Sequence, residues 1–146
     1  VDELNACLGA ARAALDDVDL EQAIVLIQQE LFAVGARLAD PSARIAGRVT
    51  KAVVTPEAIQ RLEQTIDRLE QELPPLRRFI LPGGGSAGAL LHLARTVCRR
   101  AERRVVSLGP DTVDAIVIIY LNRLSDLLFM MARAANRRSG ILEIEW

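Results

Sequence analysis

Aromatic residues are scarce in this chain of 146 residues, which holds three phenylalanines, one tyrosine and one tryptophan. Aromatics make up 3% and hydrophobic residues 51%, so the core must be built from Leu, Ile, Val and Ala. That mixture favours packed helices over a sandwich of short strands. A chain of this length can bury a substantial core as one unit. We therefore expect a single all-α domain over residues 1–146.

Cysteine and histidine are nearly absent: the chain has Cys7, Cys98 and His92 and no others. No CxxC or Cys/His spacing suits zinc, and two cysteines make no disulfide framework. We expect a reducing, cytoplasmic setting and no metal centre built from these side chains. Cys98 is expected to be a packing residue, and His92 a partly buried, hydrogen-bonded one.

The chain also lacks a membrane signature and an excess of positive charge. No apolar run reaches the roughly 18 residues of a membrane span, and no signal peptide pattern is present. The formal net charge is -1, which argues against nucleic acid as a partner. Of 18 basic residues only Lys51 is lysine, and arginine forks suit carboxylates and phosphates.

Apolar periodicity and helix breakers predict five helices joined by mostly short links. Such helices form an up-and-down bundle, with the most apolar fifth helix at its centre or at a subunit contact. The tail 141–146 is expected to be extended or to lie on a neighbour. The expected helices cover about 2–15, 19–39, 56–73, 86–107 and 111–138, with Asp19, Thr55, Ser86 and Asp111 as N-caps.

Arginines are concentrated in the run FILPGGGSAGALLHLARTVCRRAERR at 79–104. Arg95, Arg99 and Arg103 fall at i, i+4 and i+8 and share one helix face, with Arg100 and Arg104 in a second row. Spacing alone leaves two equal alternatives. One is a solvated face paired with acids elsewhere, and the other is a clamp for a polyanion.

A Pro82–Gly85 turn stands before this helix. It lacks the GxxxxGK[ST] pattern and a preceding strand, so a helix connection that needs positive φ is favoured over a phosphate loop. For Phe79, spacing alone favours packing against the turn over a wedge that faces a ligand. Asn122 and Asp126 interrupt the apolar fifth helix at i, i+4 and need polar partners.

Four motifs, in matching order and with fitting gaps, resemble the PduO-type ATP:cob(I)alamin adenosyltransferases over nearly the whole chain. They are VDELNA at 1–6, FILPGG at 79–84, ARTVCRRAER at 94–103 and YLNRLSDLLF at 120–129. The resemblance implies a five-helix bundle that assembles as a homotrimer with active sites between adjacent subunits. It also implies transfer of the 5′-deoxyadenosyl group of ATP to Co(I) of reduced cobalamin, giving adenosylcobalamin and triphosphate, with Mg²⁺ bridging the phosphates.

The same resemblance implies roles for single residues. Arg95 and Arg99 are expected at the ATP site, where Arg95 would also pair with Asp2 of a neighbouring subunit. Glu102 and Asn122 resemble residues of the nucleotide site. Arg103 and Arg104 are weaker candidates.

Phe79 resembles the aromatic wedge that displaces the lower axial base of cobalamin. The resulting four-coordinate cob(II)alamin is easier to reduce. The chemistry needs no protein nucleophile, because Co(I) itself attacks.

The family also carries a TRTGDxGxT-like segment that wraps the ATP phosphates and precedes the VDELNA motif. This sequence starts at that motif, so the segment is expected upstream of Val1 or is absent. The loop at 42–54 is expected to give ATP one basic residue, from Arg44, Arg48 or Lys51. A reductase and an adenosylcobalamin-dependent enzyme are expected partners. A non-catalytic cobalamin carrier or chaperone and a helical interaction module are the alternatives.

Overall fold

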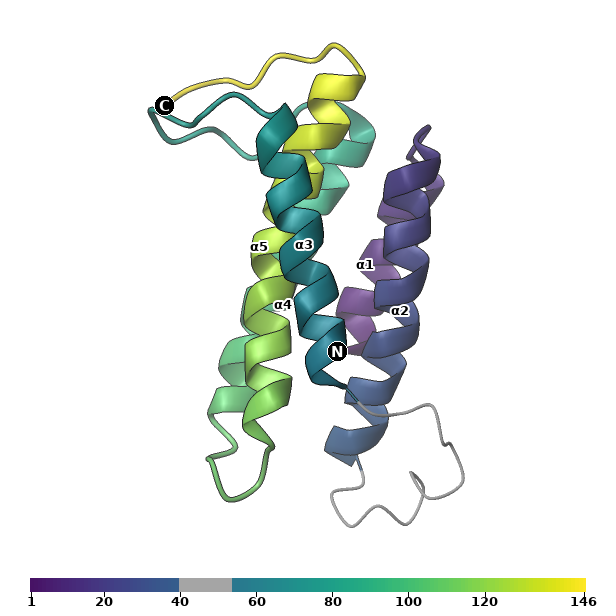
Figure 1. The fold of residues 1–146 in the computed structure, drawn as a ribbon, viewed down its shortest axis with the longest axis vertical. Coiled ribbons are helices and arrows are strands. Elements are labelled where there is room, and N and C mark those ends of the chain that lie inside the picture. The colour runs from purple at the N-terminus through teal and green to yellow at the C-terminus, as the bar shows by residue number, and fades with distance from the viewer. Residues whose placement is uncertain (40–53) are drawn as a thin grey trace.

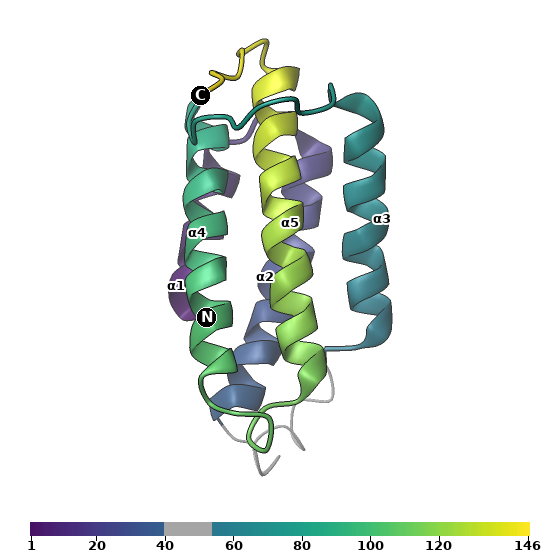
Figure 2. The ribbon, with the colours of Figure 1, turned by 90° about the vertical axis from the view of Figure 1, so that its left-hand side faces the viewer.

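The computed structural model describes residues 1–39 and 54–146, and these residues form five α-helices. The helices are α1 (Asp2–Ala13), α2 (Val18–Ala39), α3 (Pro56–Glu72), α4 (Ser86–Val106) and α5 (Ala115–Arg138). Figure 2 shows α5 in front between α4 and α3, with α1 and α2 behind them. The predicted five-helix, all-α architecture is confirmed.

Helix α5 is the central element of the bundle, as its all-round apolar sequence predicts. It packs against α4, α3 and α2, and Tyr120, Leu124 and Leu128 on it are completely buried. Among the described helices, α5 alone is long and apolar enough to cross a membrane by length and composition. Half of its most apolar window is buried inside the bundle, which is the property of a core helix.

Of the four predicted N-caps, one is confirmed. Thr55 caps α3, since its hydroxyl accepts the Ala58 N–H at 3.3 Å and Pro56 takes the first helical position. The predicted Asp19 cap of α2 is wrong, because the Leu20 N–H binds Asp17 Oδ1 at 3.0 Å. Asp19 instead lies inside the first turn of α2.

The two remaining cap predictions are also wrong. Gly85 precedes α4, so Ser86 is its first helical residue, and Asp114 rather than Asp111 precedes α5. Gly85 has no side chain that could cap α4, and the Asp114 side chain makes no cap bond. A turn closed by the bond from Thr112 N–H to the Gly109 carbonyl delays the start of α5.

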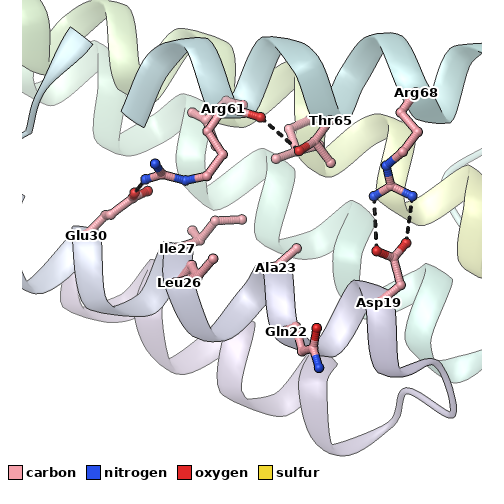
Figure 3. A pocket seen from close by; sticks show the side chains of 11 residues that line it. Asp19, Gln22, Ala23, Leu26, Ile27, Glu30, Arg61, Thr65 and Arg68 are labelled. Carbon is pink, nitrogen blue, oxygen red and sulfur yellow. Dashed lines mark hydrogen bonds and ion pairs between the residues drawn. The ribbon is translucent and has the colours of Figure 1, made fainter. Parts of the chain in front are cut away.

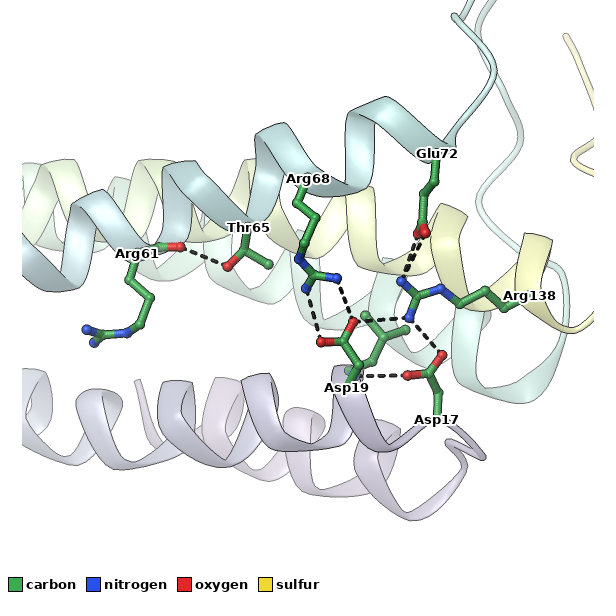
Figure 4. Close-up of polar contacts among 8 residues, drawn as sticks. Asp17, Asp19, Arg61, Thr65, Arg68, Glu72 and Arg138 are labelled. Atoms are coloured by element: carbon green, nitrogen blue, oxygen red, sulfur yellow. Dashed lines mark hydrogen bonds and ion pairs between the residues drawn. The ribbon is translucent and has the colours of Figure 1, made fainter.

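A charged network joins α2, α3 and α5 at one end of the bundle (Figure 4). Arg138 binds Asp17 at 2.8 Å, Asp19 at 3.3 Å and Glu72 at 2.9 Å. Arg68 binds the same Asp19 through two hydrogen bonds of 2.8 and 3.1 Å. The network holds α3 beside α2, in addition to the packing of α3 on α5.

The C-terminal tail is extended, as expected, and it pairs with the segment before α4. The Leu81 N–H donates to the Ile144 carbonyl and the Trp146 N–H to the Phe79 carbonyl, both at 2.8 Å. Both segments lie together at one end of the molecule (Figure 1). The tail therefore lies on its own chain, beside Phe79.

Candidate functional site

A pocket of ≈ 660 Å³ lies between α4, α5 and the segment that carries Phe79. Three residues named by the resemblance, Phe79, Arg95 and Arg99, line it together. Helix α5 contributes Ser125, Asp126 and Phe129 to the same wall. The fold thus brings an aromatic side chain and two arginines from distant motifs to one cavity.

Phe79 is 79% exposed, so the expectation that it packs against the glycine turn is wrong. Its ring makes an edge contact with Trp146, with centroids 6.4 Å apart. An exposed large aromatic ring at the edge of a pocket is available to an apolar ligand. This placement favours the wedge role.

Arg95 is held against an aromatic ring that the sequence reasoning did not single out. Its guanidinium carbon lies 5.5 Å from the Phe129 centroid, and that of Arg133 lies 6.0 Å from the same ring. Phe129 follows Asn122 and Asp126 at i+7 and i+3, and this shared helix face was the signal that would have found it.

The charge on Arg95 has no salt-bridge partner among the described residues of its own chain. Burial and the nearby charge of Arg99 lower the pKa of Arg95 below its ordinary value. Its buried Nε has no hydrogen-bond partner among the residues that the structure describes. A buried guanidinium donor without a partner fits an anion or carboxylate supplied from outside the chain.

The other arginines of α4 divide into two groups. Arg100 pairs with Glu3 of α1. Arg99, Arg103 and Arg104 are exposed, and no carboxylate of the described residues forms a salt bridge with them. Pairing with acids therefore explains Arg100 alone, and the anion clamp is the better account of the pocket face.

Glu102 and Asn122, which the resemblance assigns to the nucleotide site, contact each other beyond the arginines. The Asn122 side-chain amide donates to Glu102 Oε1 at 2.9 Å. At 1.5 Å per residue, the α4 backbone from Arg95 to Glu102 spans about 10 Å. The pocket arginines and this pair therefore form a polar row that extends beyond the residues lining the pocket.

Asp2 and the loop residues are the remaining candidates outside the pocket, whose lining also excludes Glu102 and Asn122. Asp2 is exposed in the first turn of α1 and forms no ion pair with Arg95 of its own chain. Its pairing with Arg95 of a neighbouring subunit stays a prediction. Arg44, Arg48 and Lys51 lie outside the described residues.

The glycine turn is a helix connection and not a phosphate loop. Gly84 has φ +104°, as the preference for positive φ predicts. The Gly85 N–H, which a phosphate would need, is bound to Asn136 Oδ1 at 3.1 Å.

No activated nucleophile stands at this site. Burial, with Glu102 nearby, raises the pKa of the Cys98 thiol to about 12, and the thiol contacts the Leu121 carbonyl at 3.3 Å. Cys98 is a packing residue, as predicted.

His92 is buried, and burial lowers its pKa, but its Nδ1 has no partner among the described residues, which differs from the expected hydrogen bond. The part of the chain that the structure covers holds no group of three or more His, Cys, Asp or Glu suited to a metal.

A second pocket of ≈ 200 Å³ lies between α2 and α3 (Figure 3). Its charged side chains bind one another, because Arg61 pairs with Glu30 and Arg68 with Asp19. Self-paired charges leave little to recognise a ligand. The α4–α5 pocket is the stronger candidate, because its Arg95 and Arg99 form no salt bridge with the described residues.

The sequence model of the cobalamin adenosyltransferase family matches residues 1–135 of this chain. The chain belongs to the cobalamin adenosyltransferase family. The candidate pocket is thus a feature of a cobalamin adenosyltransferase fold, in which the four motifs of the sequence stand on α1, α4, α5 and the turn between α3 and α4.

Curated members of this family are similar over most of the chain. A corrinoid adenosyltransferase of Bacillus subtilis is 44% identical over 151 residues, covering 100% of this chain and 76% of the relative. One of Mycobacterium tuberculosis is 41% identical, covering 97% and 75%. The corrinoid adenosyltransferase PduO of Salmonella typhimurium is 42% identical, covering 93% and 40%.

Solved structures of this cobalamin adenosyltransferase family have the same fold. A phenylalanine-to-alanine variant of the PduO-type ATP:corrinoid adenosyltransferase of Lactobacillus reuteri, complexed with cobalamin and ATP, matches with TM-score 0.89 and 34% identity, covering 99% of this chain and 81% of that one. An arginine-to-lysine variant of the same enzyme, complexed with ATP, matches with TM-score 0.88 and 34% identity, covering 99% and 82%.

Proposed function

We propose that this cobalamin adenosyltransferase transfers the 5′-deoxyadenosyl group of ATP to the cobalt of reduced cobalamin. The observation that carries the proposal is the pocket lined by exposed Phe79 together with Arg95 and Arg99 of α4. Family membership and the complexes of related enzymes with cobalamin and ATP support it.

In the proposed reaction, the Co(I) electron pair attacks the C5′ carbon of ATP. The Co–C bond forms, the C5′–O bond breaks, and its electron pair leaves with triphosphate. The substrates supply the nucleophile and the leaving group, so the protein must align them and stabilise the charge that develops on triphosphate. In this proposal Arg95 and Arg99 bind that charge, which is supported by their position in the lining of the pocket.

Phe79 occupies the corrin end of the site in this proposal. Its exposed ring takes the place of the lower axial base of cobalamin and leaves a four-coordinate cob(II)alamin that is easier to reduce. The apolar ring provides no ligand to cobalt, which is why it favours the lower coordination number.

Glu102 and Asn122 bind the nucleoside part of ATP. Their mutual hydrogen bond fixes both side chains at the end of the polar row. A Mg²⁺ ion that accompanies ATP would take most of its ligands from phosphate oxygens and water, as this ion commonly does.

The site is completed in a homotrimer, where Asp2 of one subunit pairs with Arg95 of the next. The buried, unpartnered Nε of Arg95 supports this pairing, because a carboxylate would satisfy it. A cytoplasmic location, a reductase and an adenosylcobalamin-dependent enzyme as partners stay predictions.

The function is tested by mixing the full-length protein with ATP, Mg²⁺ and chemically reduced cobalamin. We expect adenosylcobalamin, seen by its light-sensitive absorbance, and triphosphate in equal amounts. Tight binding of cobalamin without ATP turnover would favour the carrier alternative and contradict the proposal.

A further inference from the structure

Asn136, near the end of α5, is a buried polar side chain whose bonds all go to the glycine turn. It is 3% exposed. Its Nδ2 donates to the Gly83 carbonyl at 3.0 Å, and its Oδ1 accepts the Gly85 N–H at 3.1 Å. The side chain therefore bridges the residue on each side of Gly84, across 51 to 53 positions of sequence.

The surrounding glycines leave room for this side chain. A Cβ atom on Gly84 would lie 2.2 Å from Asn136 Oδ1, and one on Gly88 would lie 2.1 Å from the same atom. Gly88 stands in the first turn of α4, where glycine costs about 1 kcal/mol relative to alanine. The need to make room for the Asn136 side chain explains why glycine stands at position 88 in spite of this cost.

The C-terminal tail starts from the same place. The Asn136 carbonyl accepts the Ile141 N–H at 2.8 Å, and a Cβ on Gly85 would lie 2.6 Å from Ile141 Cδ1. One turn earlier, buried Arg133 binds Glu143 of the tail at 2.9 Å. The end of α5 thus anchors both segments that meet at Phe79.

The segment that carries Phe79 is otherwise held by the tail and by the end of α5. Besides the Leu81–Ile144 backbone bond, Arg78 pairs with Glu145 at 3.8 Å, and Arg133 donates to the Pro74 carbonyl at 2.8 Å. Phe79 stands outside the helices, and its polar contact is the bond from Trp146 N–H to its carbonyl. Arg95 and Arg99, in contrast, are fixed on α4. The turn at 83–85 is the covalent connection between the two parts of the pocket.

We propose that Asn136 is a positioning residue for adenosyl transfer, which sets the place of Phe79 relative to Arg95 and Arg99 by holding the glycine turn and the tail to α5. This inference rests on the proposed function. Asn136 touches no substrate in this role. A displacement of about 1 Å within a reacting site costs up to about 10²-fold in rate, so the anchor matters for the step that uses Phe79.

The test compares Asn136→Asp and Gly88→Ala with Gly83→Ala in the full-length protein. Asn136→Asp keeps an acceptor for Gly85 but, when ionised, lacks the donor to Gly83. Gly88→Ala displaces the Asn136 side chain from the other side. Gly83→Ala is the matched control, because its Cβ would meet nothing within 4 Å and its φ is not positive.

Each variant is assayed from cob(II)alamin with a reductant and from pre-reduced cob(I)alamin, and its Kd for ATP is measured. We expect both test variants to lose about 10²-fold in rate from cob(II)alamin, and less from cob(I)alamin, with ATP binding unchanged. Trp146, the one tryptophan of the chain, should shift its fluorescence as its contact with Phe79 is released. Gly83→Ala should match the parent protein in every measurement.

Wild-type rates from cob(II)alamin in the folded test variants would overturn the inference, and so would an equal loss in ATP affinity. If Asn136→Asp does not fold, Gly88→Ala decides by the same criteria. If the parent protein itself forms no Co–C bond, the proposed function fails. In that case an unchanged Trp146 spectrum in the test variants would also overturn the positioning role.

Discussion

At the scale of single residues, two side chains of the site have contacts that their own chain leaves unfilled. Phe79 lacks burial, and Arg95 lacks a partner for its Nε among the described residues. Phe129 supports the Arg95 guanidinium from one side by cation–π contact. In the proposed complex, a corrin ring covers Phe79 and a triphosphate lies beside the arginines, which explains these features together.

Phe79→Ala tests the proposed division of the pocket. We expect it to slow the reaction that starts from cob(II)alamin far more than it weakens ATP binding, because the wedge acts on cobalt coordination. The rate from cob(II)alamin and the Kd for ATP, measured on the same preparation, check this. Phe32→Ala, which removes a similarly exposed ring on α2 outside the pocket, is the control. Equal losses in the rate and in ATP binding would instead indicate a structural role for Phe79.

At the scale of elements, periodicity predicted the helices because their buried stripes are local patterns. In α2 the stripe of apolar residues at helical spacing is buried at Ile24, Ile27, Leu31 and Val34 and partly buried at Leu38. The prediction of N-caps failed where several candidate residues are close together in the sequence. Asp17 and Asp19 are equally good caps in sequence, and the distant Arg138 and Arg68, which bind them, are not visible in a local window.

The sequence could indicate those site residues that belong to the four motifs. The motifs singled out Phe79, Arg95 and Arg99, and the structure shows that they line one pocket, while their roles stay predictions. Phe129 shares a helix face with Asn122 and Asp126, which was a usable signal, but Asn136 was missed because its role depends on contacts with residues 51 or more positions away. Such long-range contacts leave no periodic signal.

The Asp17 cap gives a prediction about stability. Asp17→Ala removes both the cap and the ion pair to Arg138, whereas Asp17→Asn keeps a good cap and removes the charge. We expect Asp17→Ala to lower the free energy of unfolding by about 1 kcal/mol more than Asp17→Asn. Urea denaturation at pH 7 measures both. Equal effects of the two substitutions would show that the cap contributes nothing.

The contribution of the Asp17 carboxyl to the free energy of unfolding should depend on pH. Burial alone would raise the pKa of Asp17, but the Leu20 N–H and Arg138 outweigh it, and the net pKa lies below the ordinary 3.8. The stability that the ionised group contributes is therefore present above pH 3.8 and is lost as the pH falls through the lower folded-state value. The difference in unfolding free energy between the parent protein and Asp17→Asn should shrink across that acid range. A difference that stays constant would contradict the assignment.

At the scale of the whole molecule, the proposed site needs two subunits. Asp2→Ala and Arg99→Ala should each be nearly inactive alone. In trimers that mix the two variants equally at random, about a quarter of the sites between subunits keep both residues. We expect activity to return to about that fraction after co-expression. No recovery would indicate that Asp2 and Arg99 act within one subunit, or that Asp2 has no role.

The central claim is that the α4–α5 pocket is where the adenosyl group is transferred. It is tested most directly by the initial rate of Co–C bond formation from ATP and pre-reduced cob(I)alamin in Arg99→Ala and Arg100→Ala. The two arginines are neighbours on α4, but Arg99 lines the pocket and Arg100 pairs with Glu3 of α1. We predict that Arg99→Ala loses at least about 10²-fold in rate while it stays folded, and that Arg100→Ala stays close to the parent protein. A folded Arg99→Ala variant with the parent rate would contradict the claim.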